Sequence, residues 1–283
     1  MNLQKSASVF TRHLYRIPGG YFIVQIVKRM FFNSPETTTW QTFAFRGIKM
    51  RVDLSKQMGA AIFWRGAHDW APIFALEKVV KSGDIVLDIG ANQGEYSLWA
   101  ARKTGQKGKV YAFEPLKSMY DQLLHNISLN PKYASVINPI QIGLSDEENR
   151  LNLYSGNLEN EGVNTLFPDT DSTMLETIQL KKLDDIVKEI KIGKIDGIKI
   201  DVEGAEFMVL KGGFETIKKN MPYLFIEINK EACRKAGYEA AAIFDLLTPL
   251  GYKFKLIRLR GAMTPLDLAK LPEFCNIFAY KPR

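Results

Sequence analysis

Strand-like apolar runs alternate with helical patterns through most of this 283-residue chain. Alternation of this kind is typical of right-handed βαβ crossovers, which build a mostly parallel sheet with helices on both faces. Ligands bind such a sheet in the crevice at the carboxyl ends of its strands. We predict strands over residues 85–89, 110–113, 136–142, 197–201, 223–228, 252–258 and 276–280, and helices over 71–80, 96–103, 118–129, 206–219 and 240–250.

Two other stretches depart from this alternation. Residues 42–52 alternate enough to predict a short hairpin ahead of the main domain, after a turn-rich joint at 33–39. Residues 151–180 are rich in Gly, Asn, Asp and Thr, and we expect them to form a small strand pair and a loop over the crevice.

The composition excludes several classes of protein. A hydrophobic share of 46% with 24% charged residues is typical of a globular chain, not of a disordered or polytopic membrane chain. Cys233 and Cys275 are too few for a disulfide scaffold and offer no zinc-binding spacing. The start of the chain lacks the apolar core of a secretory signal. We therefore expect a cytoplasmic protein.

The net charge of +7 lies entirely at the start of the chain. Residues 1–52 hold eight Lys and Arg against Glu36 alone, so the rest is neutral overall. A general nucleic-acid-binding surface on the body is therefore not indicated. We divide the chain into a basic N-terminal extension, residues 1–40, and a main domain, residues 41–283.

The extension contains an amphipathic helix at residues 21–32. Its apolar stripe consists of Phe22, Ile23, Ile26, Val27 and Met30. A helix with such a stripe and basic residues can rest on an anionic membrane surface, here the inner face. It can equally pack on its own domain or on a second copy in a homo-oligomer. All three interpretations stay open at this point.

The most informative run is IVLDIGANQGEYS at residues 85–97, an apolar strand followed by a glycine turn and a helix start. It lacks the third glycine of the dinucleotide motif, and Asp88 would meet a pyrophosphate unfavourably. A cationic ligand suits this charge better, and S-adenosylmethionine fits. Gly90 and Gly94 would let the backbone approach its aminoacyl part, and Asp88 could receive its ammonium group. The alternative is an ordinary strand-to-helix turn.

Two further strand ends support a nucleoside-containing cofactor. Glu114 follows the second strand, where a carboxylate can accept hydrogen bonds from both ribose hydroxyls, although NAD sites share this feature. After the third strand, Asp146 could accept a hydrogen bond from the adenine amine, or it could simply cap a turn.

Carboxylates crowd the fourth strand end in DGIKIDVEGAE, residues 196–206. Asp201 and Glu203 could position an acceptor hydroxyl, take its proton or hold a divalent cation. We favour proton transfer, with Asp201 ahead of Glu203. We place no metal there because the cluster offers no histidine. Glu227 and Asn229, at the next strand end, should face the same crevice.

His68 is a further candidate for the general base, because it precedes the first βα unit in a stretch expected to border the cofactor. The alternative for this residue is a turn or surface histidine.

Taken in order, DIGANQGEYS, FEP, GLSD, IKIDVEGAE, LKGG and LFIEIN resemble the FkbM family of S-adenosylmethionine-dependent methyltransferases. The resemblance runs from about Asp53 to the C-terminus. It implies the class I methyltransferase fold, an α/β, Rossmann-like seven-stranded sheet whose last strand is antiparallel. It also implies O-methylation of a hydroxyl on a sugar or a polyketide-type natural product.

The resemblance also implies roles for the matching positions. Glu114 would bind the ribose, and Ser145 with Asp146 would border the adenine. Asp69-Trp70 stands where the family usually has Glu-Pro, and Asp69 is counted with the cofactor residues on that ground. The cofactor loop would consist of Asp88, Gly90, Asn92 and Gly94.

We therefore expect an S-adenosylmethionine-dependent O-methyltransferase that acts on a hydroxyl of a saccharide or a related natural product. One alternative is N-methylation of RNA or protein. Another is a catalytically inactive, cofactor-binding assembly subunit.

Overall fold

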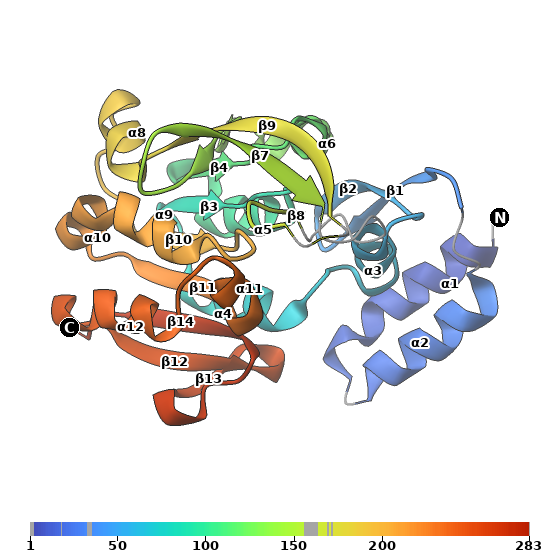
Figure 1. The fold of residues 1–283 in the computed structure, drawn as a ribbon. Coiled ribbons are helices and arrows are strands. Elements are labelled where there is room, and N and C mark those ends of the chain that lie inside the picture. Colours follow the sequence, from blue (N-terminus) through green and yellow to red (C-terminus); the bar gives the residue numbers. More distant parts are fainter. Residues whose placement is uncertain are drawn as a thin grey trace.

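An eight-stranded sheet forms the centre of the molecule in this computed structural model, which describes residues 3–282 apart from 18, 33–35, 156–163, 169 and 171 (Figure 1). The strand order is β13-β12-β14-β11-β10-β3-β4-β5. Neighbours from β5 to β11 are parallel, whereas β14 is antiparallel to both β11 and β12. The strands are β3 (Ile85–Ile89), β4 (Lys109–Phe113), β5 (Ile137–Ile140), β10 (Gly197–Ile200), β11 (Tyr223–Asn229), β12 (Lys253–Arg258), β13 (Ala262–Pro265) and β14 (Phe274–Tyr280).

Seven of these strands lie where the sequence predicts them, and the last is antiparallel as expected. The eighth, β13, adds an antiparallel edge to β12. Its four residues are mostly exposed and end in Pro265, so they carry no alternating apolar signal.

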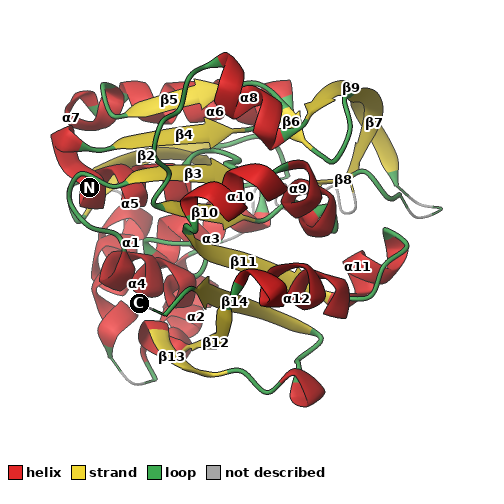
Figure 2. Cartoon of the chain, turned by 90° about the vertical axis from the view of Figure 1, so that its left-hand side faces the viewer, coloured by secondary structure: helices red, strands yellow, loops and turns green. Residues whose placement is uncertain are grey.

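Helices cover both faces of the sheet (Figure 2). Side chains alternate between these faces, so Val86 of β3 belongs to one hydrophobic core and Leu87 to the other. The first core packs against α4 (Trp70–Val79), α5 (Glu95–Thr104), α6 (Lys117–Ser128) and α7 (Pro131–Ala134). The second packs against α8 (Leu183–Glu189), α9 (Glu206–Gly212), α10 (Phe214–Asn220), α11 (Lys230–Lys235) and α12 (Ala241–Leu247).

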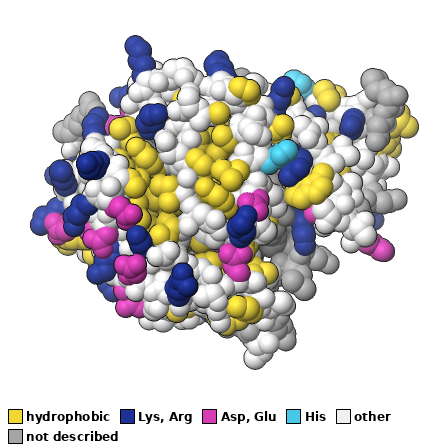
Figure 3. Space-filling model, turned by 90° about the horizontal axis from the view of Figure 1, so that it is seen from above, with side chains coloured by type: hydrophobic (Ala, Val, Ile, Leu, Met, Phe, Trp, Pro, Cys, Tyr) yellow, Lys and Arg dark blue, Asp and Glu magenta, His cyan; other side chains and the backbone are white. Residues whose placement is uncertain are grey.

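A second, four-stranded sheet stands above the crevice in the order β6-β9-β7-β8. It consists of β6 (Gly143–Leu144), β7 (Asn149–Ser155), β8 (Asn164–Thr165) and β9 (Thr173–Lys181). The predicted strand pair is the β7–β9 pairing, and the central part of the predicted loop, residues 156–163, lies outside the described residues. Hydrophobic side chains gather on the face seen in Figure 3, and the exposed ones on β7 and β9 are Leu151, Met174 and Leu175.

The N-terminal segment forms a helical hairpin of α1 (Leu3–Arg12), the short helix η1 (His13–Arg16) and α2 (Gly20–Phe31). It packs against α3 (Gln57–Arg65), next to the hairpin of β1 (Trp40–Phe45) and β2 (Ile48–Asp53). The sequence predicts α2 and the β-hairpin but neither α1 nor α3. No helix in the described part of the chain is long and apolar enough to span a bilayer.

Candidate active site

A cavity of about 370 Å³ opens at the carboxyl ends of β3, β4, β10 and β11, with the second sheet forming one of its walls. This is the position in which open α/β sheets bind ligands. The polar side chains that line it come from separate elements, and they are His68, Asp69, Asn92, Gln93, Glu95, Tyr96, Glu114, Asn164, Lys199, Asp201, Glu203, Glu227, Asn229 and Asn276.

The glycine turn after β3 runs close to the end of β10. Gly90 has a φ of +79°, and a Cβ atom there would lie 1.8 Å from the carbonyl oxygen of Asp201. The Asp201 amide in turn donates to the carbonyl oxygen of Ile89 at 3.1 Å. A side chain at position 90 would therefore force the two strand ends apart, which explains why the turn requires glycine.

Glu114 is held in place by two backbone amides. Its Oε2 accepts a hydrogen bond from Asn92 at 2.8 Å, and its Oε1 accepts one from Leu116 at 2.9 Å. Burial raises the pKa of this carboxyl to about 7. The result is an oriented carboxylate in the cavity wall, one residue beyond β4.

Lys199 is the buried cation of the site, and sequence reasoning missed it. Its Nζ lies 3.3 Å from Oδ2 of Asp201 and 3.5 Å from Oδ1 of Asp88, and it donates to the Gly90 carbonyl at 2.9 Å. Burial alone would lower its pKa, but the carboxylates of Asp201 and Asp88 outweigh burial and raise it. The sequence could have indicated Lys199, because it is the one charged residue in the otherwise apolar, buried strand Gly197–Ile200.

Two residues of the predicted cofactor loop lie beneath the cavity rather than in its wall. Asp88 is 1% exposed, and its Oδ2 accepts a hydrogen bond from Ser97 Oγ at 2.5 Å. Gly94 has a φ of +92°, and a Cβ atom there would lie 2.6 Å from Cδ1 of Leu123. Asp88 therefore supports Lys199 from below, and Gly94 allows α5 to pack against α6.

Ser145 and Asp146 also lie outside the cavity wall. Asp146 forms an ion pair with Lys211 at 2.5 Å, and a Cβ atom on Gly212 would lie 1.9 Å from the Ser145 carbonyl oxygen. These contacts fasten α9 to the loop after β6. The neighbouring residues Ile142, Gly143 and Leu144 line the cavity in their place.

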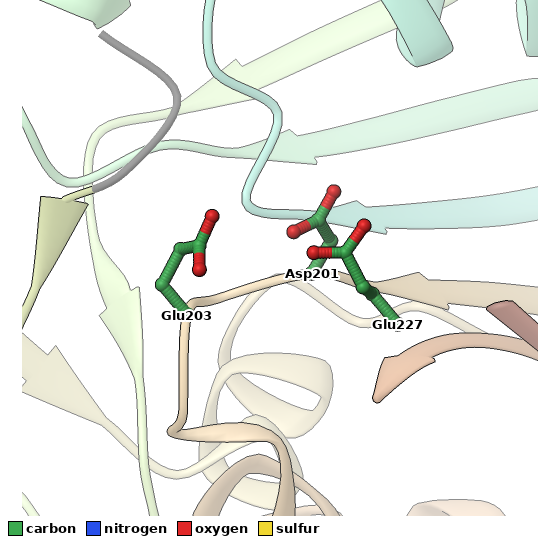
Figure 4. A group of neighbouring side chains, drawn as sticks. All are labelled: Asp201, Glu203 and Glu227. Atoms are coloured by element: carbon green, nitrogen blue, oxygen red, sulfur yellow. The ribbon is translucent and has the colours of Figure 1, made fainter. Parts of the chain in front are cut away.

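Asp201, Glu203 and Glu227 turn their carboxylates toward the same space (Figure 4). One oxygen from each lies within 4.8 Å of the others. Burial and the neighbouring charges of Asp201 and Glu206 raise the pKa of Glu203 to about 8, and burial raises that of Glu227 well above its ordinary range. Such a cluster can accept hydrogen bonds from hydroxyls, and its oxygens are ligands of the kind that hard cations take.

His68 and Asp69 join the site from the segment between α3 and α4. The His68 amide donates to both oxygens of Glu95, at 2.9 and 3.2 Å, and burial lowers the pKa of its imidazole to about 4. Asp69 caps α4, with Oδ1 accepting from the Ala71 amide at 2.9 Å. Glu95, which burial brings to a pKa of about 8, was not predicted from the sequence.

Comparison with known proteins identifies the family to which this site belongs. The family described as "Methyltransferase FkbM domain" matches residues 88–254, more than half of the chain. The chain belongs to the FkbM methyltransferase family. Residues 88–254 accordingly form an S-adenosylmethionine-dependent methyltransferase domain with a class I α/β fold.

Three relatives give the range of similarity. Methyltransferase sdnD of Sordaria araneosa is 34% identical over 161 residues, which cover 46% of this chain and 61% of that protein. Hexuronic acid methyltransferase AglP of Haloferax volcanii is 27% identical over 184 residues, which cover 65% of this chain and 69% of that protein. 2-O-methyltransferase NoeI of Sinorhizobium fredii is 24% identical over 184 residues, which cover 59% of this chain and 72% of that protein. The chain thus spans less than two thirds of the length of sdnD.

Proposed function

We propose that this FkbM methyltransferase transfers a methyl group to a hydroxyl of a saccharide or a related natural product. The observation that carries the proposal is the carboxylate cluster of Asp201, Glu203 and Glu227 at one end of the cavity. Carboxylates accept hydrogen bonds and suit an acceptor with several hydroxyls. The names of AglP, a hexuronic acid methyltransferase, and NoeI, a 2-O-methyltransferase, support the same class of acceptor.

The other end of the cavity has the chemistry to hold the cofactor. Glu114 would accept hydrogen bonds from the ribose hydroxyls, and the apolar side chains of Phe113, Ile142 and Leu144 would face the adenine. The positive charges of S-adenosylmethionine would favour the ionised forms of the carboxyls that line the cavity. In this arrangement Asp88 acts on the cofactor through Lys199 and the Gly90 carbonyl rather than by contact.

When bound, S-adenosylmethionine supplies an electrophilic methyl group, so the chain has to orient the acceptor oxygen and provide a route for its proton. Asp201, placed against Lys199, would hold the hydroxyl. Glu203 would take the proton, because its pKa of about 8 lies near neutral pH, as general-base catalysis requires. His68, with its pKa of about 4, is the weaker base.

The test is methyl transfer from S-adenosylmethionine to a panel of oligosaccharides and glycosylated natural products, read by mass spectrometry and by the position of the new O-methyl group. We expect transfer to a saccharide hydroxyl, and a loss of turnover of about two orders of magnitude in Glu203→Gln, which removes the general base. Cofactor affinity should change little in that variant. Transfer to RNA or protein nitrogen, with none to any saccharide, would overturn the proposal.

Measuring the rate of methyl transfer in the presence of EDTA distinguishes proton transfer to the carboxylates from a metal-assisted mechanism. We expect the chelator to leave the rate unchanged. Loss of activity on chelation and recovery with magnesium would instead assign the carboxylate cluster to a divalent cation.

A further inference from the structure

The hairpin of α1, η1 and α2 exposes an unusual amount of apolar surface. Of the nineteen large hydrophobic side chains that are exposed in the described part of the chain, ten lie on residues 3–31. They are Leu3, Val9, Phe10, Ile17, Tyr21, Phe22, Ile23, Ile26, Met30 and Phe31. Scattered exposed hydrophobics are ordinary, but this concentration on about a tenth of the chain is typical of an interaction surface.

On α2 the exposed side chains form one continuous face. Phe22, Ile26 and Met30 follow each other at intervals of four residues and are 71%, 61% and 70% exposed. The buried side of the same helix carries Gly20 and Val24. The helix therefore packs on the protein through one side, whereas Phe22, Ile26 and Met30 on the other side remain largely exposed.

The hairpin is firmly attached to the enzyme. Thr11 Oγ1 and Arg12 Nη1 donate to the carbonyl oxygens of Trp64 and Phe63, each at 2.7 Å, in buried positions. Leu14 and Val24 belong to the same hydrophobic core as the main sheet. The exposed apolar face therefore belongs to a hairpin that is held against the main domain by buried hydrogen bonds and core packing.

The charge around this face has one sign. Residues 1–35 contain no Asp or Glu, whereas Lys5 and Arg29 are exposed on α1 and α2. Lys28 and Arg65 lie half-buried where α2 meets α3. Two copies of the chain that met through this face would place cation against cation, with no carboxylate on either hairpin to pair with them. An anionic surface with an apolar interior satisfies both the charge and the hydrophobic side chains.

We propose that α1 and α2 dock the enzyme on an anionic phospholipid bilayer. The α2 helix has twelve residues, which is too short to span a bilayer, and it lies in the plane of the lipid interface. Phe22, Ile26 and Met30 enter the acyl boundary, and Lys5 and Arg29 face the phosphate groups. Because α3 packs against this hairpin and ends three residues before His68, docking holds the cavity in a fixed position relative to the membrane.

Vesicle flotation of the full chain tests the proposal. We expect the protein to float with vesicles that contain phosphatidylglycerol and to stay in solution with pure phosphatidylcholine. The triple variant Phe22→Ser, Ile26→Ser, Met30→Ser should bind the anionic vesicles with an affinity reduced by at least about tenfold. The matched control is Leu259→Ser, which removes an 85% exposed hydrophobic side chain on η4 (Leu259–Gly261), outside the hairpin.

Two charge variants complete the design. Lys5→Gln with Arg29→Gln should weaken flotation and reduce its sensitivity to salt, whereas Lys188→Gln, at an exposed position on α8, should change neither. Unchanged affinity for S-adenosylhomocysteine shows that each variant is folded.

Three results would overturn the proposal. One is absence of flotation with the anionic vesicles, and another is equal flotation with both lipid compositions. The third is a lipid-free dimer that the triple variant dissociates, measured by analytical ultracentrifugation, which would assign the face to a second copy of the chain.

Discussion

Lys199 shows most clearly how single residues organise this site. Its ammonium group lies between Asp88 and Asp201 and binds the carbonyl of the glycine turn, so it joins β3 to β10 at the cavity. Removal of one partner from a buried ion pair typically costs about 3–5 kcal/mol, because the other charge is left uncompensated. The position of Asp88 at a strand end could be predicted from the sequence. Its burial under Lys199 could not, because that depends on which strand becomes the neighbour of β3.

Glu203 gives the site its expected pH dependence. Its pKa of about 8 means that the carboxyl holds a proton at neutral pH and becomes a base as the pH rises. We expect the rate of methyl transfer to increase by about tenfold per pH unit below that pKa and to level off above it. In Glu203→Gln the rate should be low and this increase should be absent.

Initial rates across this pH range provide the measurement. Glu148→Gln, at an exposed loop position before β7, is the matched control and should keep the wild-type profile. Persistence of the same increase in Glu203→Gln would show that another group takes the proton.

At the scale of elements, local patterns predicted the strands and the glycine turns well because each strand ends where its apolar run ends. Local patterns did not predict the features that depend on tertiary packing, such as helix ends and the placement of helices. The helix predicted over 206–219 is split at Gly213, where a Cβ atom would lie 2.7 Å from Cδ2 of Leu183. Helix α1 was not predicted from the sequence, although its residues have a strongly amphipathic helical pattern, and neither was the packing of α3 against it, which depends on contacts between distant segments.

The close contact between the β3 turn and β10 yields a prediction for Gly90→Ala. Gly83→Ala is the matched control, because both glycines have a positive φ, +79° and +89°, at which alanine costs roughly 1–2 kcal/mol. A Cβ atom at Gly83 meets nothing closer than 3.9 Å, whereas one at Gly90 meets the Asp201 carbonyl. We expect Gly90→Ala to lower the melting temperature well beyond the control and to abolish binding of S-adenosylhomocysteine.

Thermal unfolding and calorimetry on the two variants decide this point. Equal losses of stability in both, with cofactor binding retained in Gly90→Ala, would show that the approach of the two strand ends is not needed.

At the scale of the whole molecule, the buried carboxyls make stability depend on pH. Glu95 and Glu203 have pKa values of about 8 and Glu114 about 7, all raised from 4.5, so the folded chain binds protons more tightly than the unfolded chain. Stability must then fall as the pH rises from about 4.5 to about 8. His68 acts in the opposite sense, but only between its folded pKa of about 4 and its unfolded pKa of 6.5.

We therefore expect the melting temperature to fall between about pH 6.5 and about pH 8.5, by about 2–4 °C for each kcal/mol lost. Glu95→Gln should reduce this slope because it removes one of the three groups. A melting temperature that stays constant or rises over this interval would contradict the protonation states assigned to the site.

Part of the overall layout of the molecule could also be predicted from the sequence. The order of the motifs placed Gly90, Glu114, Asp201 and Glu227 at neighbouring strand ends, and all four line one cavity. The second sheet and the helical hairpin were only partly predictable, because Leu153, Ile178 and Leu180 acquire their role as cavity wall through contacts between distant segments.

The central claim is that the cofactor binds in this cavity with its ribose on Glu114, and calorimetry with S-adenosylhomocysteine tests it most directly. Glu176→Gln is the matched control, since Glu176 also accepts a hydrogen bond from a backbone amide, that of Lys117, but lies outside the cavity wall. Loss of charge-assisted hydrogen bonds costs roughly 1.5–3 kcal/mol, so we predict that Glu114→Gln weakens binding by about ten- to a hundredfold while Glu176→Gln binds like the wild type. Wild-type affinity in Glu114→Gln would contradict the account.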